Sequence, residues 1–165
     1  MKRNQTHGRI PRSYVEVGPD VTVKRFVRPE SAAHELSFYK LVPWACPELL
    51  DHDELTLTMR TYECAVDLPD WKPLGELRAL LQRLHRVGVH HRDLHVKNVL
   101  RRPDGSPVLI DWECAVVMRT HLSYDLSGPG VSKVPVPDLH VRLNVTPAWW
   151  HSRERHSIFN RWERA

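Results

Sequence analysis

Three oxygen-bearing side chains at short intervals are the residues of this sequence best able to do chemistry together. Asp93 and Asn98 stand five positions apart in the segment His-Arg-Asp-Leu-His-Val-Lys-Asn, and Asp111 follows thirteen residues after Asn98. A carboxylate and an amide in one loop can face the same reacting group, where the carboxylate orients a hydroxyl proton and the amide oxygen holds a cation. A small number of hard oxygen ligands is typical of magnesium, which keeps water or phosphate oxygens for its other positions. The spacing is therefore compatible with a magnesium site at this loop, and also with a loop whose aspartate and asparagine only cap turns.

A helix and a hairpin are expected to position these residues. The leucines of residues 74–84 recur at three- and four-residue spacing, which predicts a helix that begins near Pro73 and is stopped by Gly88. Residues 99–101 and 107–110 flank an Arg-Pro-Asp-Gly-Ser turn, so a hairpin is expected to deliver Asp111 at the end of a strand.

The preceding half of the chain predicts a second hairpin and a second helix. Apolar and polar residues alternate in 14–17 and 21–26 across a Gly-Pro-Asp turn, a helix is expected from Pro29 to about Leu41, and 55–59 alternates as a strand. Beyond residue 115 the chain is expected to be irregular, with a closing amphipathic helix over Pro147 to Trp162. This order favours an α+β domain with two small sheets and argues against a doubly wound sheet.

Residues 91–98 match the catalytic-loop pattern H-R-D-x-x-x-x-N, and the sequence here resembles the protein-kinase-like superfamily. His95 stands where protein kinases usually carry a lysine, and Ile-Asp-Trp-Glu at 110–113 replaces the usual Asp-Phe-Gly. Both details are closer to the aminoglycoside-phosphotransferase and lipopolysaccharide-kinase branches. The resemblance covers roughly residues 14–115.

The resemblance implies a compact, truncated protein-kinase-like fold in a single domain over residues 1–165. Residues 1–60 would form a reduced N-terminal lobe, with a small β-sheet and one helix. Residues 61–165 would form a reduced, mainly helical C-terminal lobe that contains the catalytic loop 91–98 and the metal motif 110–113.

The resemblance also implies ATP and Mg²⁺ as cofactors and transfer of the γ-phosphoryl group to a hydroxyl of a protein or small molecule. Asp93 would act as the base or orient the acceptor hydroxyl. Asn98 and Asp111 would hold the metal and, through it, the nucleotide. Such a reaction rests on positioning and charge neutralisation.

Upstream partners follow from the same resemblance. Lys24 matches the lysine that holds the nucleotide phosphates, and Glu35 best matches the helix glutamate that pairs with it, with Glu30 as the alternative. Residues Met59 to Glu63 would connect the lobes and bind adenine through backbone groups. A solvent-facing lysine on an edge strand and a solvated helix carboxylate are the plain alternatives for Lys24 and Glu35.

The sequence departs from the pattern at both ends. Only Gly8 and Gly18 precede Lys24 and no GxGxxG is present, so a trimmed N-terminal lobe with a more open phosphate site is expected. Contacts to phosphate, or a solvated arm, are the two interpretations of the basic residues Lys2, Arg3, Arg9 and Arg12. No A-P-E follows the metal motif, which points to a reduced peptide-docking surface. The segment 123–128 either resembles the Asp-containing segment that supports the catalytic loop of kinases or is a surface loop.

Other functions remain open on the sequence. A pseudokinase would keep the fold and bind or regulate without turnover, and an enzyme with the same site could transfer a nucleotidyl group. A basic nucleic-acid-binding domain is disfavoured but would show salt-dependent binding. A zinc site is disfavoured because no second ligand set accompanies the cluster His90, His91, Asp93 and His95.

Composition limits the compartment and the partners. The net charge is +4, and no apolar run approaches the roughly 18 residues of a membrane span. Three well-separated cysteines without CxxC pairing predict free thiols in a reducing, cytoplasmic setting. The Trp- and Arg-rich tail from Trp149 to Trp162 would cap an open core, which is the favoured interpretation. It could also stack on bases, anchor at a membrane surface, or form an interface with a partner protein or a second copy.

Overall fold

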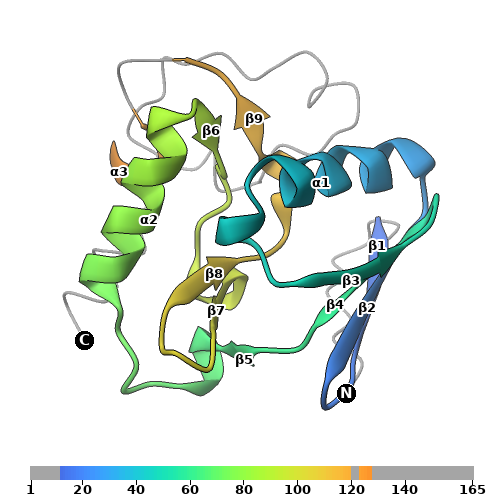
Figure 1. Cartoon of the computed structure of the whole chain (residues 1–165), viewed down its shortest axis with the longest axis horizontal. Helices are drawn as coiled ribbons and strands as arrows, with labels where there is room; N and C mark the ends of the chain where they lie inside the picture. Colours follow the sequence, from blue (N-terminus) through green and yellow to red (C-terminus); the bar gives the residue numbers. More distant parts are fainter. Residues whose placement is uncertain (1–11, 120–122, 128–165) are drawn as a thin grey trace.

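The computed structural model describes residues 12–119 and 123–127, which form two parts (Figure 1). One part is a four-stranded sheet with a single helix, and the other combines helices with two small sheets. The first part is an antiparallel sheet in the order β1-β2-β4-β3 with one helix, α1 (Pro29–Leu41), beside it. Its strands are β1 (Ser13–Val17), β2 (Val21–Phe26), β3 (Leu49–His52) and β4 (Thr56–Arg60). The helix predicted over Pro147 to Trp162 lies outside the described residues.

The β1–β2 hairpin places Lys24 in the interior of the sheet. Its tight turn requires Gly18, whose backbone N–H donates to the Val21 carbonyl at 2.9 Å. A Cβ added to Gly18 would lie 2.8 Å from the same oxygen, closer than side chains tolerate. Strand β2 pairs with β1 on one side and with β4 on the other, so Lys24 lies opposite Val15 and Leu57. The period of two then turns Lys24 inward and Arg25 outward.

Proline residues limit α1 at both ends. Pro29 occupies the first turn, where its missing N–H costs no intrahelical hydrogen bond, and Pro43 begins the short 3₁₀ turn η1 (Pro43–Ala45) after the helix ends. The inner side of α1 carries Ala32, Phe38 and Tyr39, all buried. It also carries Glu35, a carboxylate among apolar neighbours.

The second part contains α2 (Leu74–Arg86), α3 (Tyr124–Ser127) and two small antiparallel sheets, in the orders β5-β7-β8 and β6-β9. Their strands are β5 (Glu63–Cys64), β6 (Val89–His90), β7 (Val99–Arg101), β8 (Pro107–Leu109) and β9 (Val116–Val117). The 3₁₀ turns here are η2 (Ala65–Asp67), η3 (Val96–Asn98) and η4 (Trp112–Cys114).

Helix α2 follows the leucine pattern of the sequence. Leu77, Leu81 and Leu84 are at most 1% exposed and face the core. The helix ends where Gly88 takes a φ of +77°, a conformation that costs glycine little and terminates many helices. The chain then enters β6 and the loop with Asp93.

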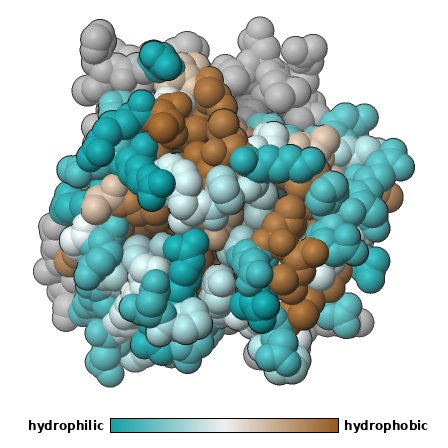
Figure 2. All heavy atoms as spheres, in the orientation of Figure 1, coloured by the Kyte–Doolittle hydropathy of each residue, from teal (hydrophilic) through white to brown (hydrophobic). Residues whose placement is uncertain are grey.

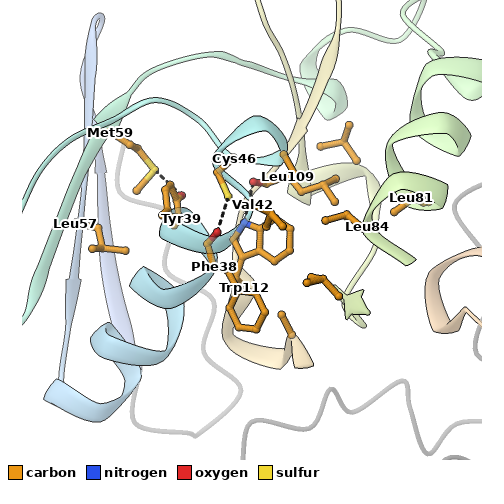
Figure 3. Packing of buried hydrophobic residues seen from close by; sticks show 14 of the residues in the cluster. Phe38, Tyr39, Val42, Cys46, Leu57, Met59, Leu81, Leu84, Leu109 and Trp112 are labelled. Carbon is orange, nitrogen blue, oxygen red and sulfur yellow. Dashed lines mark hydrogen bonds between the residues drawn. The ribbon is translucent and has the colours of Figure 1, made fainter. Parts of the chain in front are cut away.

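Trp112 lies at the centre of the core that joins the two parts (Figure 3). It is fully buried, and its ring stacks on Phe38 of α1 with centroids 5.5 Å apart. Its indole N–H donates to the Leu109 carbonyl at 3.1 Å, so burial leaves the polar atom satisfied. Leu81 and Leu84 approach the same core from α2. The residue after Asp111 thus packs the metal motif between α1 and α2.

The described elements confirm the predicted α+β class with small antiparallel sheets. On the face in Figure 2, apolar residues gather over the sheet at the right and in an upper patch, with hydrophilic residues between them. No helix among the described residues is long and apolar enough to cross a membrane.

Candidate active site

Lys24 is the centre of a buried charge cluster. Its side chain is 7% exposed, and its ammonium group lies 2.7 Å from Glu35 Oε2 and 2.9 Å from Asp111 Oδ1. A third carboxylate, Glu113 Oε1, lies at 3.8 Å. Burial acts to lower the pKa of Lys24, but the surrounding carboxylates outweigh it and hold the pKa well above its ordinary value. The lysine therefore stays protonated and positively charged.

Glu35, and not Glu30, is the α1 carboxylate that reaches Lys24. Glu35 is fully buried, whereas Glu30 lies exposed in the first turn of α1. Burial raises the pKa of Glu35 to about 7, although the charge of Lys24 acts in the opposite direction. Its second oxygen, Oε1, has no hydrogen-bond partner among the described residues. This carboxylate is held in place by the lysine alone.

Asp111 arrives directly after β8 in a left-handed backbone conformation, with a φ of +67°. Such a conformation is uncommon for a residue other than glycine and persists only where the surroundings impose it. The burial of Trp112 on one side and the strand on the other provide that restraint. Burial favours the neutral acid, but Lys24 outweighs it and lowers the pKa of Asp111. The carboxylate keeps 41% of its side-chain exposure and can meet a ligand.

Asp93 and Asn98 face each other across the catalytic loop. The Asn98 amide nitrogen donates to the Asp93 carbonyl at 2.9 Å and lies 3.4 Å from Asp93 Oδ2. Since the amide nitrogen points at Asp93, the amide oxygen is the atom that a cation would meet. His95 Nε2 lies 3.8 Å from the same Asp93 oxygen. Burial lowers the pKa of His95, while Asp93 acts to raise it.

Residue Ile110 ties the catalytic loop to the metal motif. Its backbone N–H donates to the Asn98 carbonyl at 3.1 Å, and its carbonyl lies 2.9 Å from His91 Nε2. The other ring nitrogen of His91 accepts from the Asp93 backbone N–H at 3.3 Å, so Nε2 carries the proton and donates to Ile110. Asn98, directly before β7, is thereby held beside Ile110, the residue that precedes Asp111.

Asp125 fixes the start of the catalytic loop from outside it. Its two carboxylate oxygens accept the backbone N–H groups of His91 at 2.7 Å and Arg92 at 2.8 Å. Arg92 has a φ of +66°, so the loop turns sharply just before Asp93. Of the two interpretations of segment 123–128, the geometry favours the one in which its aspartate supports the loop. The sequence signal for this role is a single aspartate followed by leucine and serine, which is weak.

The predicted connector, Met59 to Glu63, begins inside a strand, and its contact with adenine stays a prediction. Met59 lies inside β4 with its side chain in the core, where it accepts a hydrogen bond from the Tyr39 hydroxyl at 3.2 Å. Residues up to Arg60 belong to β4, which pairs with β2 on one side and β3 on the other, and Glu63 begins β5. Thr61 and Tyr62 therefore link the two parts. Glu113 was quoted in the motif without a role, yet it contacts the charge cluster.

Two histidines at the start of the loop contact backbone carbonyls. His90 Nε2 lies 2.9 Å from the Met118 carbonyl and His91 is bonded to Ile110, so both support backbone. Among the described residues, the group with ligand atoms within 4.8 Å of one another is Glu35, Asp111 and Glu113. All three offer oxygen ligands, which magnesium prefers, whereas zinc is bound mostly by nitrogen and sulfur ligands.

The comparisons agree with this geometry. A buried sheet lysine, its helix glutamate and a loop with aspartate and asparagine beside a metal-motif aspartate define the protein-kinase-like superfamily. Residues 24–128 match the model of the phosphotransferase enzyme family, and the chain belongs to this family. A comparison with curated proteins gives no match. The matched range begins at Lys24 and includes Asp93, Asn98 and Asp125.

Proposed function

We propose that this protein is an ATP- and Mg²⁺-dependent phosphotransferase that moves the γ-phosphoryl group of ATP to a hydroxyl group. The observation that carries the proposal is the convergence of Lys24, Glu35 and Asp111, which come from a strand, a helix and a loop far apart in the sequence. A buried ammonium between carboxylates has little structural use that an apolar residue would not serve better. Binding of a ligand that replaces one of the carboxylates beside Lys24 would explain why the cluster is present.

Lys24 would bind the nucleotide phosphates while Glu35 holds it in place. Of the two carboxylates closest to Lys24, Glu35 is the more buried and Asp111 the more exposed. A phosphate oxygen that takes the place of Asp111 beside Lys24 would leave the lysine paired on both sides. The displaced carboxylate would then be available to a cation.

Asn98 and Asp111 would hold magnesium, which when bound neutralises the charge on the phosphates. Their amide and carboxylate oxygens are the donor types that this ion takes. Asp93 would accept or orient the acceptor hydroxyl's proton, since its carboxylate lies on the same loop and its side chain is only partly buried. The hydrogen bond from Asn98 to the Asp93 carbonyl and the support that Asp125 gives to Arg92 would hold the backbone of Asp93 in place.

The acceptor is a hydroxyl of a small molecule or a protein. Because no A-P-E motif follows residue 113, a large peptide-docking surface is not expected, which favours small acceptors. The thiols of Cys46 and Cys64, which form no disulfide among the described residues, support a cytoplasmic location, where ATP is abundant and thiols stay reduced. The proposed partner interface over Trp149 to Trp162 lies outside the described residues.

A pseudokinase that binds nucleotide without transfer is the second candidate, favoured by the lack of a GxGxxG motif before Lys24. The intact pair of Asp93 and Asn98 argues for turnover. The two candidates share nucleotide binding and differ in transfer of the phosphoryl group.

Calorimetric titration with ATP, with and without Mg²⁺, tests the nucleotide site. Wild type should bind only weakly without the metal, and Asp111→Asn should weaken Mg-ATP binding by at least roughly tenfold, because a charged ligand to the cation is lost. The exposed Asp51→Asn on β3 is the matched control and should bind as wild type. If the wild-type protein binds no ATP in this titration, either with or without Mg²⁺, the proposal is refuted.

A further inference from the structure

Arg12 is a second cation directed at the carboxylates around Lys24. It directly precedes β1, and its carbonyl accepts the Val27 backbone N–H at 2.9 Å, which fixes the start of β1 beside the end of β2. Its guanidinium Nη1 lies 3.6 Å from Glu113 Oε2. The other Glu113 oxygen lies 3.8 Å from the Lys24 ammonium. One carboxylate thus stands between the two cations.

The ion pair of Arg12 and Glu113 spans from the sheet to the metal motif. Glu113 belongs to η4, two residues after Asp111, whereas Arg12 belongs to the edge of the four-stranded sheet. Arg12 is thereby placed next to the cluster of Lys24, Asp111 and Glu113. The Arg12 side chain is 32% accessible and that of Glu113 14%, so the arginine is the partner that a ligand can reach. If Arg12 turned to a ligand, Glu113 would keep Lys24 at 3.8 Å as a second cation.

Phosphate is such a ligand. The guanidinium presents several N–H donors in a planar fork that fits phosphate oxygens in pairs. In kinases with a Gly-rich loop, backbone N–H groups cover the phosphates, and this sequence carries no GxGxxG before Lys24. The guanidinium of Arg12, directly before β1, offers N–H donors next to Glu113 and Lys24.

We propose that Arg12 binds the phosphates of the nucleotide and is held ready by Glu113 in the free protein. Lys24 then holds the phosphates from within the sheet and Arg12 from its edge. Glu113 keeps the neighbouring Lys24 as a partner when Arg12 moves, so its carboxylate is not left alone. This inference rests on the proposed function, because it needs a nucleotide at Lys24 and Asp111.

Calorimetry of the full chain with Mg-ATP and with adenosine separates a phosphate contact from a structural one. Arg12→Ala should weaken Mg-ATP binding on the order of ten- to a hundredfold, the range for lost hydrogen bonds to a charged group, and leave adenosine binding within about twofold. Arg12→Lys should recover only part of the loss, since an ammonium cannot offer the paired donors. Circular dichroism should show that each variant folds as wild type.

Arg25→Ala is the matched control, because Arg25 carries the same charge on β2 but is exposed on the opposite face from Lys24. It should bind Mg-ATP as wild type. Equal affinities for Arg12→Ala and Arg25→Ala would overturn the role of Arg12 and leave the proposed function intact, provided that Asp111→Asn still weakens binding. Equal losses with Mg-ATP and adenosine would show that Arg12 acts on the fold. A wild-type protein that binds no nucleotide would refute both proposals.

Discussion

Lys24 and Glu35 define the electrostatics of the site at the scale of single residues. Glu35 is fully buried, and its pKa rises to about 7 from an ordinary value of 4.5. The folded state therefore holds this proton more tightly than the unfolded chain does. It follows that the contribution of Glu35 to the free energy of unfolding is complete below about pH 4.5 and is lost as the pH rises through about 7. The Asp111 pKa is lowered, so its contribution has the opposite sign and is lost in acid.

Removal of the Lys24 charge should raise the pKa of Glu35 further. Lys24→Met keeps most of the side-chain volume but removes the charge that stabilises the ionised carboxylate, so the pKa should move above 7. The carboxyl carbon shift of labelled glutamate, followed by NMR against pH, measures it. Arg25→Met, which removes an exposed charge on the other face of β2, should leave the value near that of wild type. An unchanged Glu35 pKa in Lys24→Met would contradict the ion pair.

At the scale of elements, short segments are positioned by contacts from elsewhere in the chain. Trp112 anchors η4 between α1 and α2, which sets the place of Asp111. Arg102, after β7, donates to the carbonyls of Trp44 at 3.0 Å and Cys46 at 3.1 Å and so ties the hairpin to the turn after α1. The catalytic loop has no regular structure before η3 and depends on Asp125 from α3.

Asp125→Ala should loosen the catalytic loop while the nucleotide site persists. Two hydrogen bonds from backbone N–H groups to a buried carboxylate are lost, and each is worth about 1.5–3 kcal/mol. Hydrogen exchange of the His91 and Arg92 amides should accelerate, and phosphoryl transfer should slow on the order of a hundredfold because Asp93 is displaced. Asp104→Ala removes an exposed aspartate that only closes a turn, and it should change neither. If the His91 and Arg92 amides exchange as slowly in Asp125→Ala as in wild type, the supporting role of Asp125 is contradicted.

For the whole molecule, local sequence patterns predicted the longer helices and strands. The shorter strands depend on pairing with segments elsewhere in the chain. The leucine spacing predicted α2, and the alternation around Gly18 predicted the first hairpin, because both patterns report a single buried face. Strand β3 was missed because its residues are mostly exposed and do not alternate, and it forms only by pairing with β4. The strands β6 and β9 were missed because two residues are too few to show a periodic pattern, although both residues of β6 are buried.

The candidate site was predictable to a similar extent. A loop motif carries Asp93 and Asn98, so sequence alone located them. Sequence could not choose between Glu30 and Glu35 with certainty, because the choice depends on which face of α1 meets β2. Arg12 and Glu113 meet across 101 positions of sequence, and that juxtaposition exists only in the fold.

Label transfer from γ-³²P-ATP by wild type and Asp93→Asn tests the central claim most directly. Wild type should release or transfer label in the presence of Mg²⁺. Asp93→Asn should bind Mg-ATP with an affinity within about threefold of wild type and lose label transfer by roughly a hundredfold or more, the usual contribution of a positioned base. The surface variant Asp104→Asn should match wild type. Equal rates in Asp93→Asn and wild type, or nucleotide binding without turnover in wild type, would contradict the phosphotransferase account.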